Sequence, residues 1–353
     1  MRVLIVKRDK LGDLLLTTPI LARLADARPD AEIHLLANDY NAWVARDHPA
    51  VHRTWTYPRV RDGGRLRVRA ALAHLPIAWR LRRQRFDVAV VMGGDESPRG
   101  IRRAIGTGAA RVIAYAHDAA RYGARLTDPL AVPADGHEVE RMLALLAPLR
   151  VPQDPVTDGP TFALPDASRA FARHWLAGRG VAPGGYVVLG LGARRAKKQP
   201  DTGQVVRWSR HLHDTYGLAT VFTWTPGGRD APGYPGDDAT AAPVLAQGLA
   251  HLHPFRGSIG EAIALLWHAR TSVLPDSGLM HFAAASPGGV LGLFADPADG
   301  SPAARWAPRG ARARYLEAAR AVADVDDATV FAALAPLVAP AVTTVAAGGT
   351  ATG

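Results

Sequence analysis

The sequence predicts an α/β protein in which two Rossmann-like halves face each other across a cleft. Short runs of β-branched and aliphatic residues alternate with longer helical patterns, which is typical of parallel strands joined by crossover helices. The 353 residues exceed the range in which one hydrophobic core usually grows, and an apolar content of 48% suffices for two cores. Residues 151–165 are rich in Pro, Asp, Thr and Gly, which indicates a connection between the halves.

Each half is expected to contribute four strands and its own helices. The predicted strands cover residues 2–6, 32–37, 86–92 and 111–115 in the first half and 186–191, 219–224, 271–274 and 290–294 in the second. The helices that bear on function are predicted at residues 137–149, 168–178, 204–216, 260–269, 278–285 and 327–338. The expected domains are 1–160 and 161–325, followed by a final helix at 326–340 and a disordered tail at 341–353.

Composition excludes several kinds of chemistry. The chain has no cysteine, so disulfides, thiolate catalysis, zinc–thiolate sites and iron–sulfur clusters are ruled out. The N-terminal apolar run is one short strand followed by charged residues, unlike a signal peptide. No later apolar run approaches the roughly 20 residues that span a bilayer. We therefore expect a cytoplasmic protein.

The formal charge of +10 predicts a basic surface that attracts anionic partners. Arginines are densest over residues 59–85, where apolar residues lie between them. Two interpretations stay open: peripheral contact with an anionic membrane, through Arg80, Arg82 and Arg83, and an ordinary solvated helical face. Nucleic acid is not an expected partner, because no recognition motif accompanies the charge and only 7% of residues are aromatic.

Residues 271–294 carry the most informative pattern, a buried strand that runs into a helix of small and apolar residues. Asp276 is expected to cap this helix, which Ser277 and Gly278 begin. The free N–H groups and the positive dipole at such a helix start bind anions, and His281 lies on the same face as Ser277. An ordinary capped turn with a packed histidine is the competing interpretation.

A second basic pattern follows the strand at 186–191. Gly192 is followed by the cations Arg194, Arg195, Lys197 and Lys198, and Asp201 or Thr202 is expected to cap the next helix. Cations in a glycine-containing loop can neutralise phosphate, although the spacing is neither that of a Walker motif nor that of a dinucleotide fingerprint. A solvated basic loop explains the pattern equally well.

The third pattern lies behind the first strand, where Gly12 and Asp13 precede Thr17, Thr18 and Pro19. With Thr18 as the cap and Pro19 at the first helical position, Asp13 would lie in a loop, free to act as a base. Alternatively, Asp13 itself caps a helix that is kinked at Pro19. Both interpretations stay open.

These three patterns, in this order, resemble glycosyltransferase family 9, the ADP-heptose:lipopolysaccharide heptosyltransferases. The resemblance runs from Met1 to about Pro308 and is strongest over residues 276–284. Weaker supports are residues 137–139, in the sequence His-Glu-Val, and residues 305–308, in the sequence Arg-Trp-Ala-Pro. The resemblance implies a fold of the glycosyltransferase B type, with a glycan or lipid-linked acceptor in the first domain and a nucleotide-sugar donor in the second.

The resemblance also implies roles for individual residues. Asp13 would deprotonate the acceptor hydroxyl, and Lys197 would stabilise the leaving diphosphate. The hydroxyl oxygen would attack opposite that diphosphate, so that the anomeric configuration inverts. The donor would be held by the remaining matched positions, which are Gly192, Asp230, Asp276, Ser277, Gly278, Leu279 and His281. Neither a metal nor a cofactor would be needed, and the donor would be ADP-heptose.

Two departures from the family pattern put the exact donor and acceptor in question. Gln199 stands where the family usually has tryptophan, and Arg8, Asp9 and Lys10 stand where small hydroxylated residues are common. Two alternatives also remain. One is a sugar-nucleotide 2-epimerase, which needs no acceptor, and the other is a noncatalytic protein that binds polyanions or membranes.

Overall fold

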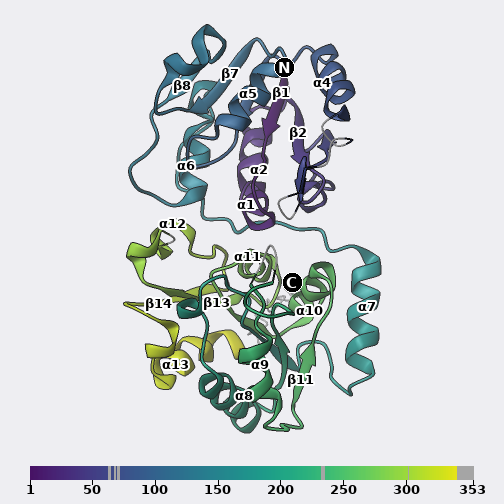
Figure 1. Ribbon diagram of the computed structural model, residues 1–353, viewed down its shortest axis with the longest axis vertical. Coiled ribbons are helices and arrows are strands. Elements are labelled where there is room, and N and C mark those ends of the chain that lie inside the picture. The colour runs from purple at the N-terminus through teal and green to yellow at the C-terminus, as the bar shows by residue number, and fades with distance from the viewer. Residues whose placement is uncertain (63–64, 67–68, 70–71, 232–234, 301, 340–353) are drawn as a thin grey trace, which may run out of the picture.

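The computed structural model describes residues 1–62, 65–66, 69, 72–231, 235–300 and 302–339. Two parallel six-stranded sheets, each flanked by helices, lie one above the other in Figure 1. This architecture confirms the predicted α/β class with two Rossmann-like halves. The expected tail at 341–353 lies outside the described residues.

The first sheet has the strand order β3-β2-β1-β6-β7-β8, and the second has the order β11-β10-β9-β12-β13-β14. Strands of the first sheet are β1 (Arg2–Val6), β2 (Glu32–Asn38), β3 (Arg53–Tyr57), β6 (Val88–Val91), β7 (Arg111–Tyr115) and β8 (Asp128–Leu130). Strands of the second are β9 (Tyr186–Gly190), β10 (Ala219–Thr223), β11 (Leu252–Phe255), β12 (Thr271–Pro275), β13 (Val290–Ala295) and β14 (Ala313–Ala318). Each sheet reverses its strand order beside its first strand, where open α/β sheets bind ligands.

Helices cover both faces of each sheet. Those of the first half are α1 (Leu11–Leu15), α2 (Thr18–Ala27), α4 (His74–Arg83), α5 (Pro98–Gly106) and α6 (Glu138–Ala144). Those of the second are α7 (Asp166–Ala177), α8 (Thr202–Tyr216), α9 (Asp238–Leu245), α10 (Ile259–His268), α11 (Gly278–Ala285), α12 (Ala303–Trp306) and α13 (Asp327–Val338). Within the described residues, no helix combines the length and apolar character that spanning a bilayer requires.

All eight predicted strands are present, but the strands β3, β8, β11 and β14 of the two large sheets were missed. A small separate sheet of β4 (Arg61–Asp62) and β5 (Arg65–Leu66) was missed as well. The central strands are buried on both faces and are therefore continuous apolar runs, as in residues 3–6 of β1. The four strands missed in the large sheets are their edge strands. They are short or polar, and β8 and β11 each contain a proline, which edge strands tolerate.

The two halves meet where α1 faces α11 (Figure 1). Both helices follow a central strand of their sheet, β1 and β12 respectively, and so begin at the carboxyl ends of the strands. The connection near residue 160 crosses this junction, and α7 then packs against α10. The fold therefore brings the first and third sequence patterns together.

Candidate active site

The backbones of the two halves approach closely at Gly12 and Gly278. A Cβ atom on Gly12 would lie 3.0 Å from the Cα of Gly278 and 3.0 Å from Cδ2 of His281. A Cβ atom on Gly278 would lie 3.5 Å from the amide nitrogen of Gly12. Such spacing admits only glycine at position 12 without a shift of the backbone. The start of α1 is thereby held against the N-terminal end of α11.

Asp13 lies at this junction, but in neither of the two predicted settings. It is the third residue of the short helix α1, and its Oδ2 atom accepts a 2.9 Å hydrogen bond from the backbone N–H of Lys10. Thr17, not Thr18, occupies the N-cap position of the separate helix α2, without a capping side-chain hydrogen bond. Burial raises the pKa of Asp13, and the charge of Asp9 raises it further, while the ammonium of Lys7 acts in the opposite direction. A carboxylate with a raised pKa is a stronger base.

Lys7 supplies a buried positive charge beneath this acid. Its side chain is fully buried, with Nζ 3.2 Å from Oδ2 of Asp9 and 3.6 Å from the sulfur of Met142. Burial disfavours the ammonium, but attraction to Asp9, Asp13 and Glu138 outweighs it and raises the pKa of Lys7. A permanent cation therefore lies among three carboxylates. This role of Lys7 was not predicted, because in the sequence it is only one of the charged residues that follow the first strand.

The two threonines after Asp13 tie α1 to its surroundings. The Thr17 hydroxyl donates a 3.0 Å hydrogen bond to the carbonyl of Asp13. The Thr18 hydroxyl donates to the carbonyl of Leu15 and accepts a 2.8 Å bond from the N–H of Thr161 in the connecting segment. These bonds fix the helix that carries Asp13 both to α2 and to the chain that crosses between the halves.

The start of α11 differs from the predicted capped turn in one respect. Ser277 occupies the N-cap position without a side-chain hydrogen bond, and Asp276 does not cap the helix. Instead, Oδ2 of Asp276 lies 2.6 Å from Nζ of Lys198. Gly278 and Leu279 form the first turn and are partly exposed. Their N–H groups are therefore available to an anion.

His281 is buried between the halves. Burial, with a contribution from His137, lowers the pKa of His281 to about 3, so the imidazole is neutral at physiological pH. Its Nδ1 atom is buried and has no hydrogen-bond partner among the described residues. The predicted donor residues Asp276, Ser277, Gly278, Leu279 and His281 thus lie together around one helix start.

The basic loop after β9 divides its two lysines between different acids. Lys197, partly exposed, forms a 2.9 Å ion pair with Asp296, which follows β13. Lys198 is buried against Asp276. The family resemblance singled out Lys197, but the structure shows that Lys198 contacts Asp276 in the turn before α11. Asp201 caps α8, in agreement with one of the two alternatives.

Asp230 lies in the exposed loop after β10, whereas the buried acid of that region is Asp237. Asp237 accepts hydrogen bonds from the Gln199 side chain at 2.7 Å and from the N–H of Thr225 at 3.1 Å. Burial raises the pKa of Asp237, which these hydrogen bonds oppose. Gln199, the residue that replaces the family tryptophan, thus braces this loop. Gly192 follows β9 beside Thr225.

An ionic clamp, formed by Glu138 and Glu140 of α6 with Arg305 and Arg309, joins the halves. Glu138 pairs with Arg305 at 2.9 Å and accepts a 2.8 Å hydrogen bond from the N–H of Gly94. Arg309 forms two hydrogen bonds with the carboxylate of Glu140. The two weaker sequence motifs, at 137–139 and 305–308, are therefore partners in space.

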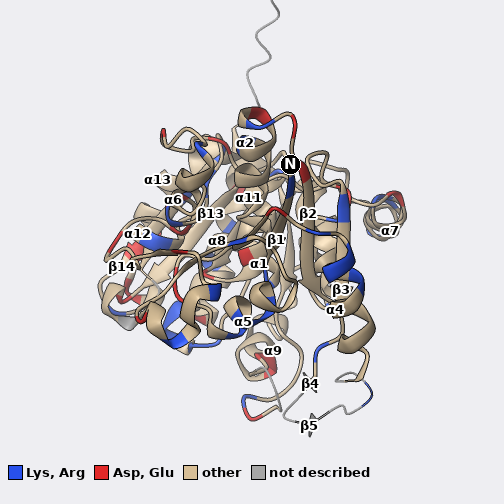
Figure 2. Ribbon diagram, turned by 90° about the horizontal axis from the view of Figure 1, so that it is seen from above, with Lys and Arg blue, Asp and Glu red and all other residues tan. Residues whose placement is uncertain are grey.

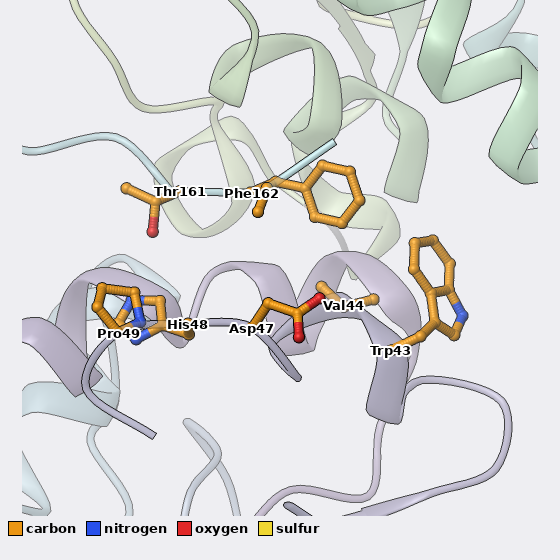
Figure 3. Close-up of a pocket in the computed structure, with 8 residues that line it drawn as sticks. Trp43, Val44, Asp47, His48, Pro49, Thr161 and Phe162 are labelled. Atoms are coloured by element: carbon orange, nitrogen blue, oxygen red, sulfur yellow. The ribbon is translucent and has the colours of Figure 1, made fainter. Parts of the chain in front are cut away.

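A small cavity of about 210 Å³ lies beside the connecting segment (Figure 3). In Figure 3, Phe162 of that segment points toward Trp43 of the first half. The two rings are 5.8 Å apart, and each also packs against Phe282 of α11, at 5.1 Å from Phe162 and 5.9 Å from Trp43. This aromatic cluster packs α11 against the first half. It stabilises the junction of α1 and α11 from outside.

The predicted membrane candidates lie apart from this junction, on α4 (Figure 1). Arg80, Arg82 and Arg83 are exposed. Arg82 donates a 2.9 Å hydrogen bond to the carbonyl of Gly106, and the guanidinium of Arg83 lies 4.7 Å from the ring centre of Trp79. The structure therefore leaves these arginines on the surface but assigns Arg82 a contact between two helices.

In the part of the chain that the structure describes, no group of three His, Asp or Glu side chains is placed to hold a metal ion. The chemistry that the junction offers is that of a carboxylate base opposite a helix start with free N–H groups. Such an arrangement can remove a proton from a hydroxyl on one side and stabilise a departing phosphate on the other.

Comparison with known proteins identifies the family of this chain. The family model of glycosyltransferase family 9 (heptosyltransferase) matches residues 75–323. Lipopolysaccharide heptosyltransferase 3 of Escherichia coli is 26% identical over 288 residues, which cover 80% of each chain.

Solved structures share the fold. A family 9 glycosyltransferase from Veillonella parvula superposes with a TM-score of 0.78 at 16% identity, covering 96% of this chain and 97% of the other. The ADP-heptose heptosyltransferase II of E. coli does so with a TM-score of 0.70 at 19% identity, covering 96% and 98%. From the extent of the family match, the chain belongs to glycosyltransferase family 9, the heptosyltransferase family, and is a glycosyltransferase.

Proposed function

We propose that this protein transfers a heptose from ADP-heptose to a lipopolysaccharide core acceptor, with inversion at the anomeric carbon and without a metal ion. The observation that carries the proposal is the contact of Gly12 with Gly278, which sets Asp13 beside the start of α11. The lipopolysaccharide relative from E. coli supports the acceptor class. A solved E. coli heptosyltransferase holds ADP-2-deoxy-2-fluoro heptose, which supports the donor.

In the proposed reaction, Asp13 removes the proton from the acceptor hydroxyl as the oxygen attacks the anomeric carbon. ADP leaves from the opposite face, which inverts the configuration. The N–H groups of Gly278 and Leu279 and the ammonium of Lys197 stabilise the diphosphate as it departs. Lys198 and Asp276 act as positioning residues, because they hold the turn before α11.

We also propose that the protein works at the cytoplasmic face of the inner membrane. Leu72, Leu75 and Trp79 are 62%, 69% and 58% exposed, beside the arginines of α4. Apolar side chains in water next to cations suit an anionic bilayer surface. Glutamate replacements at Arg80 and Arg83 should abolish binding to vesicles that contain phosphatidylglycerol, and unchanged binding would contradict this part of the proposal.

The first test is calorimetric titration with ADP-heptose, ADP, and UDP- and GDP-sugars. Selective binding of ADP-heptose is expected. Preference for another nucleotide sugar would replace the donor, and binding of none would overturn the proposal. Product formed from the donor without any acceptor would favour the epimerase. The anomeric configuration of the product, and activity that survives EDTA, test inversion and metal independence separately.

The second test replaces the base. Asp13→Asn should lower turnover at least about a hundredfold, since general-base catalysis contributes on the order of 10² to 10⁴. Donor affinity and the melting temperature should change little. Asp26→Asn, an exposed acid on the next helix, is the matched control and should behave like the wild type. Wild-type turnover in Asp13→Asn would remove Asp13 from the mechanism.

A further inference from the structure

A cavity of about 350 Å³ lies between α4 and α5, on one face of the first sheet. Four arginines line it, which are Arg8, Arg99, Arg102 and Arg103. The described residues around this cavity include no aspartate or glutamate. Figure 2 shows lysine and arginine gathered on and near these two helices. We call this cavity the arginine pocket.

The fold gathers these arginines from two places. Arg8 leaves the carboxyl end of β1, at the same edge of the sheet as Asp13. The other three lie on α5 at positions that share one helical face, since residues three and four apart are neighbours on a helix. The opposite wall is apolar and comes from Ile77, Ala78 and Leu81 of α4. A ligand in the pocket would therefore meet cations on one side and aliphatic carbon on the other.

The guanidinium groups are not fully used within the protein. The Nε atoms of Arg8 and Arg103 are buried and have no hydrogen-bond partner in the described part of the chain. The Cζ atom of Arg103 lies over the ring of Tyr57, 3.6 Å from its centre. This stacking fixes the orientation of the group but satisfies none of its N–H donors.

The surroundings make an anion favourable. Burial lowers the pKa of Arg103, and the like charge of Arg8 lowers it further. Unpaired donors and like charges in a partly buried site are costly, and a bound anion removes both costs. Guanidinium groups match phosphate oxygens in pairs of parallel hydrogen bonds.

We infer that the arginine pocket binds a phosphoryl group carried on the acceptor sugar. The inference rests on the proposed function, because it takes the ligand to be part of the acceptor. Arg8 is only five residues before Asp13 and leaves the same strand end, so a phosphate in the pocket would hold the sugar on the side of the base. Phosphate binding also explains why an arginine stands at position 8, where the family pattern favours a small residue.

Calorimetry with three probes tests the pocket, namely N-acetylglucosamine 6-phosphate, N-acetylglucosamine and inorganic phosphate. The wild type should bind the sugar phosphate at least tenfold more tightly than either of the others. Arg99→Gln/Arg102→Gln removes two exposed cations without disturbing the core and should weaken sugar-phosphate binding at least tenfold. Arg103→Gln should do the same. Arg210→Gln, an exposed arginine on α8 in the other half, is the control and should bind like the wild type.

Several outcomes would overturn the inference. Equal binding of the sugar with and without phosphate would show that no phosphoryl group is recognised. Equal binding of inorganic phosphate and the sugar phosphate would assign the pocket to free phosphate. Unchanged affinity in the pocket variants would place the site elsewhere. ADP-heptose binding, measured on the same samples, separates this result from the proposed function. Failure of the wild type to bind ADP-heptose would count against the transferase and not against the pocket.

Discussion

Glu138 and Arg305 form a 2.9 Å ion pair between the two halves of the protein, across 167 residues of sequence. Glu138 is 4% exposed and also accepts the N–H of Gly94, so its carboxylate is fully engaged. Its charge further contributes to the raised pKa of both Lys7 and Asp13. A single buried carboxylate thus connects the contact between the halves with the electrostatics of the base.

Glu138→Gln should destabilise the protein by about 1.5–3 kcal/mol, because hydrogen bonds to charged groups contribute that much and Arg305 loses its partner. Urea unfolding followed by circular dichroism measures the change. Arg320→Gln is the control, since its ion pair with Asp324 is exposed and should contribute little. A change in Glu138→Gln no larger than in the control would show that the clamp is not stabilising.

Asp9→Asn should shift the pH dependence of kcat/KM. The reaction needs ionised Asp13, so activity rises with pH through the pKa of Asp13, which lies above its ordinary value. Asp9 helps to raise this pKa and also engages Lys7. Without that charge the pKa falls, and the acidic limb of the profile should move to lower pH. Asp214→Asn, in the other half, is the control and should leave the acidic limb in place. An acidic limb that moves to higher pH in Asp9→Asn would contradict the effect of Asp9 on the pKa of Asp13.

Gly12→Ala should lower kcat/KM at least about tenfold and destabilise the protein by about 1–3 kcal/mol, the usual cost of overpacking. The added methyl group would lie 3.0 Å from the Cα of Gly278, so α1 and α11 must separate. Gly260→Ala is a matched control in α10, where the methyl group meets no atom within 4 Å among the described residues. Steady-state kinetics and thermal denaturation measure both variants, and equal behaviour would show that the close contact is dispensable.

Lys197→Gln and Lys198→Gln should have different effects. Lys197 is 35% exposed and faces solvent beside Asp296, so its loss should weaken ADP binding roughly tenfold or more while the melting temperature stays nearly constant. Lys198 is 6% exposed and pairs with Asp276, so its loss leaves a largely buried carboxylate and should lower the melting temperature by several degrees. Calorimetry measures ADP binding and thermal denaturation measures the melting temperature of each variant. Weaker ADP binding in Lys198→Gln and a lower melting temperature in Lys197→Gln would exchange the roles of the two lysines.

The amino-acid sequence by itself determined the central strands and the start of α11, and it limited the cap of α8 to Asp201 or Thr202. These features depend on neighbours within about four residues, through apolar runs and helix-capping groups. The edge strand β8 escaped detection because it is three residues long and has no continuous apolar run.

Only the tertiary structure decided which charges meet. It placed Asp13 inside α1, paired Lys198 with Asp276 over 78 residues, and buried Asp237 where Asp230 was expected. It also gathered Arg8 with the arginines of α5. Such pairs depend on where strand ends and helix starts come together when the two halves pack. No local sequence pattern encodes the distance between two charged groups that are far apart in the chain. Burial then sets their strength, because water screens the same charges when they lie on the surface.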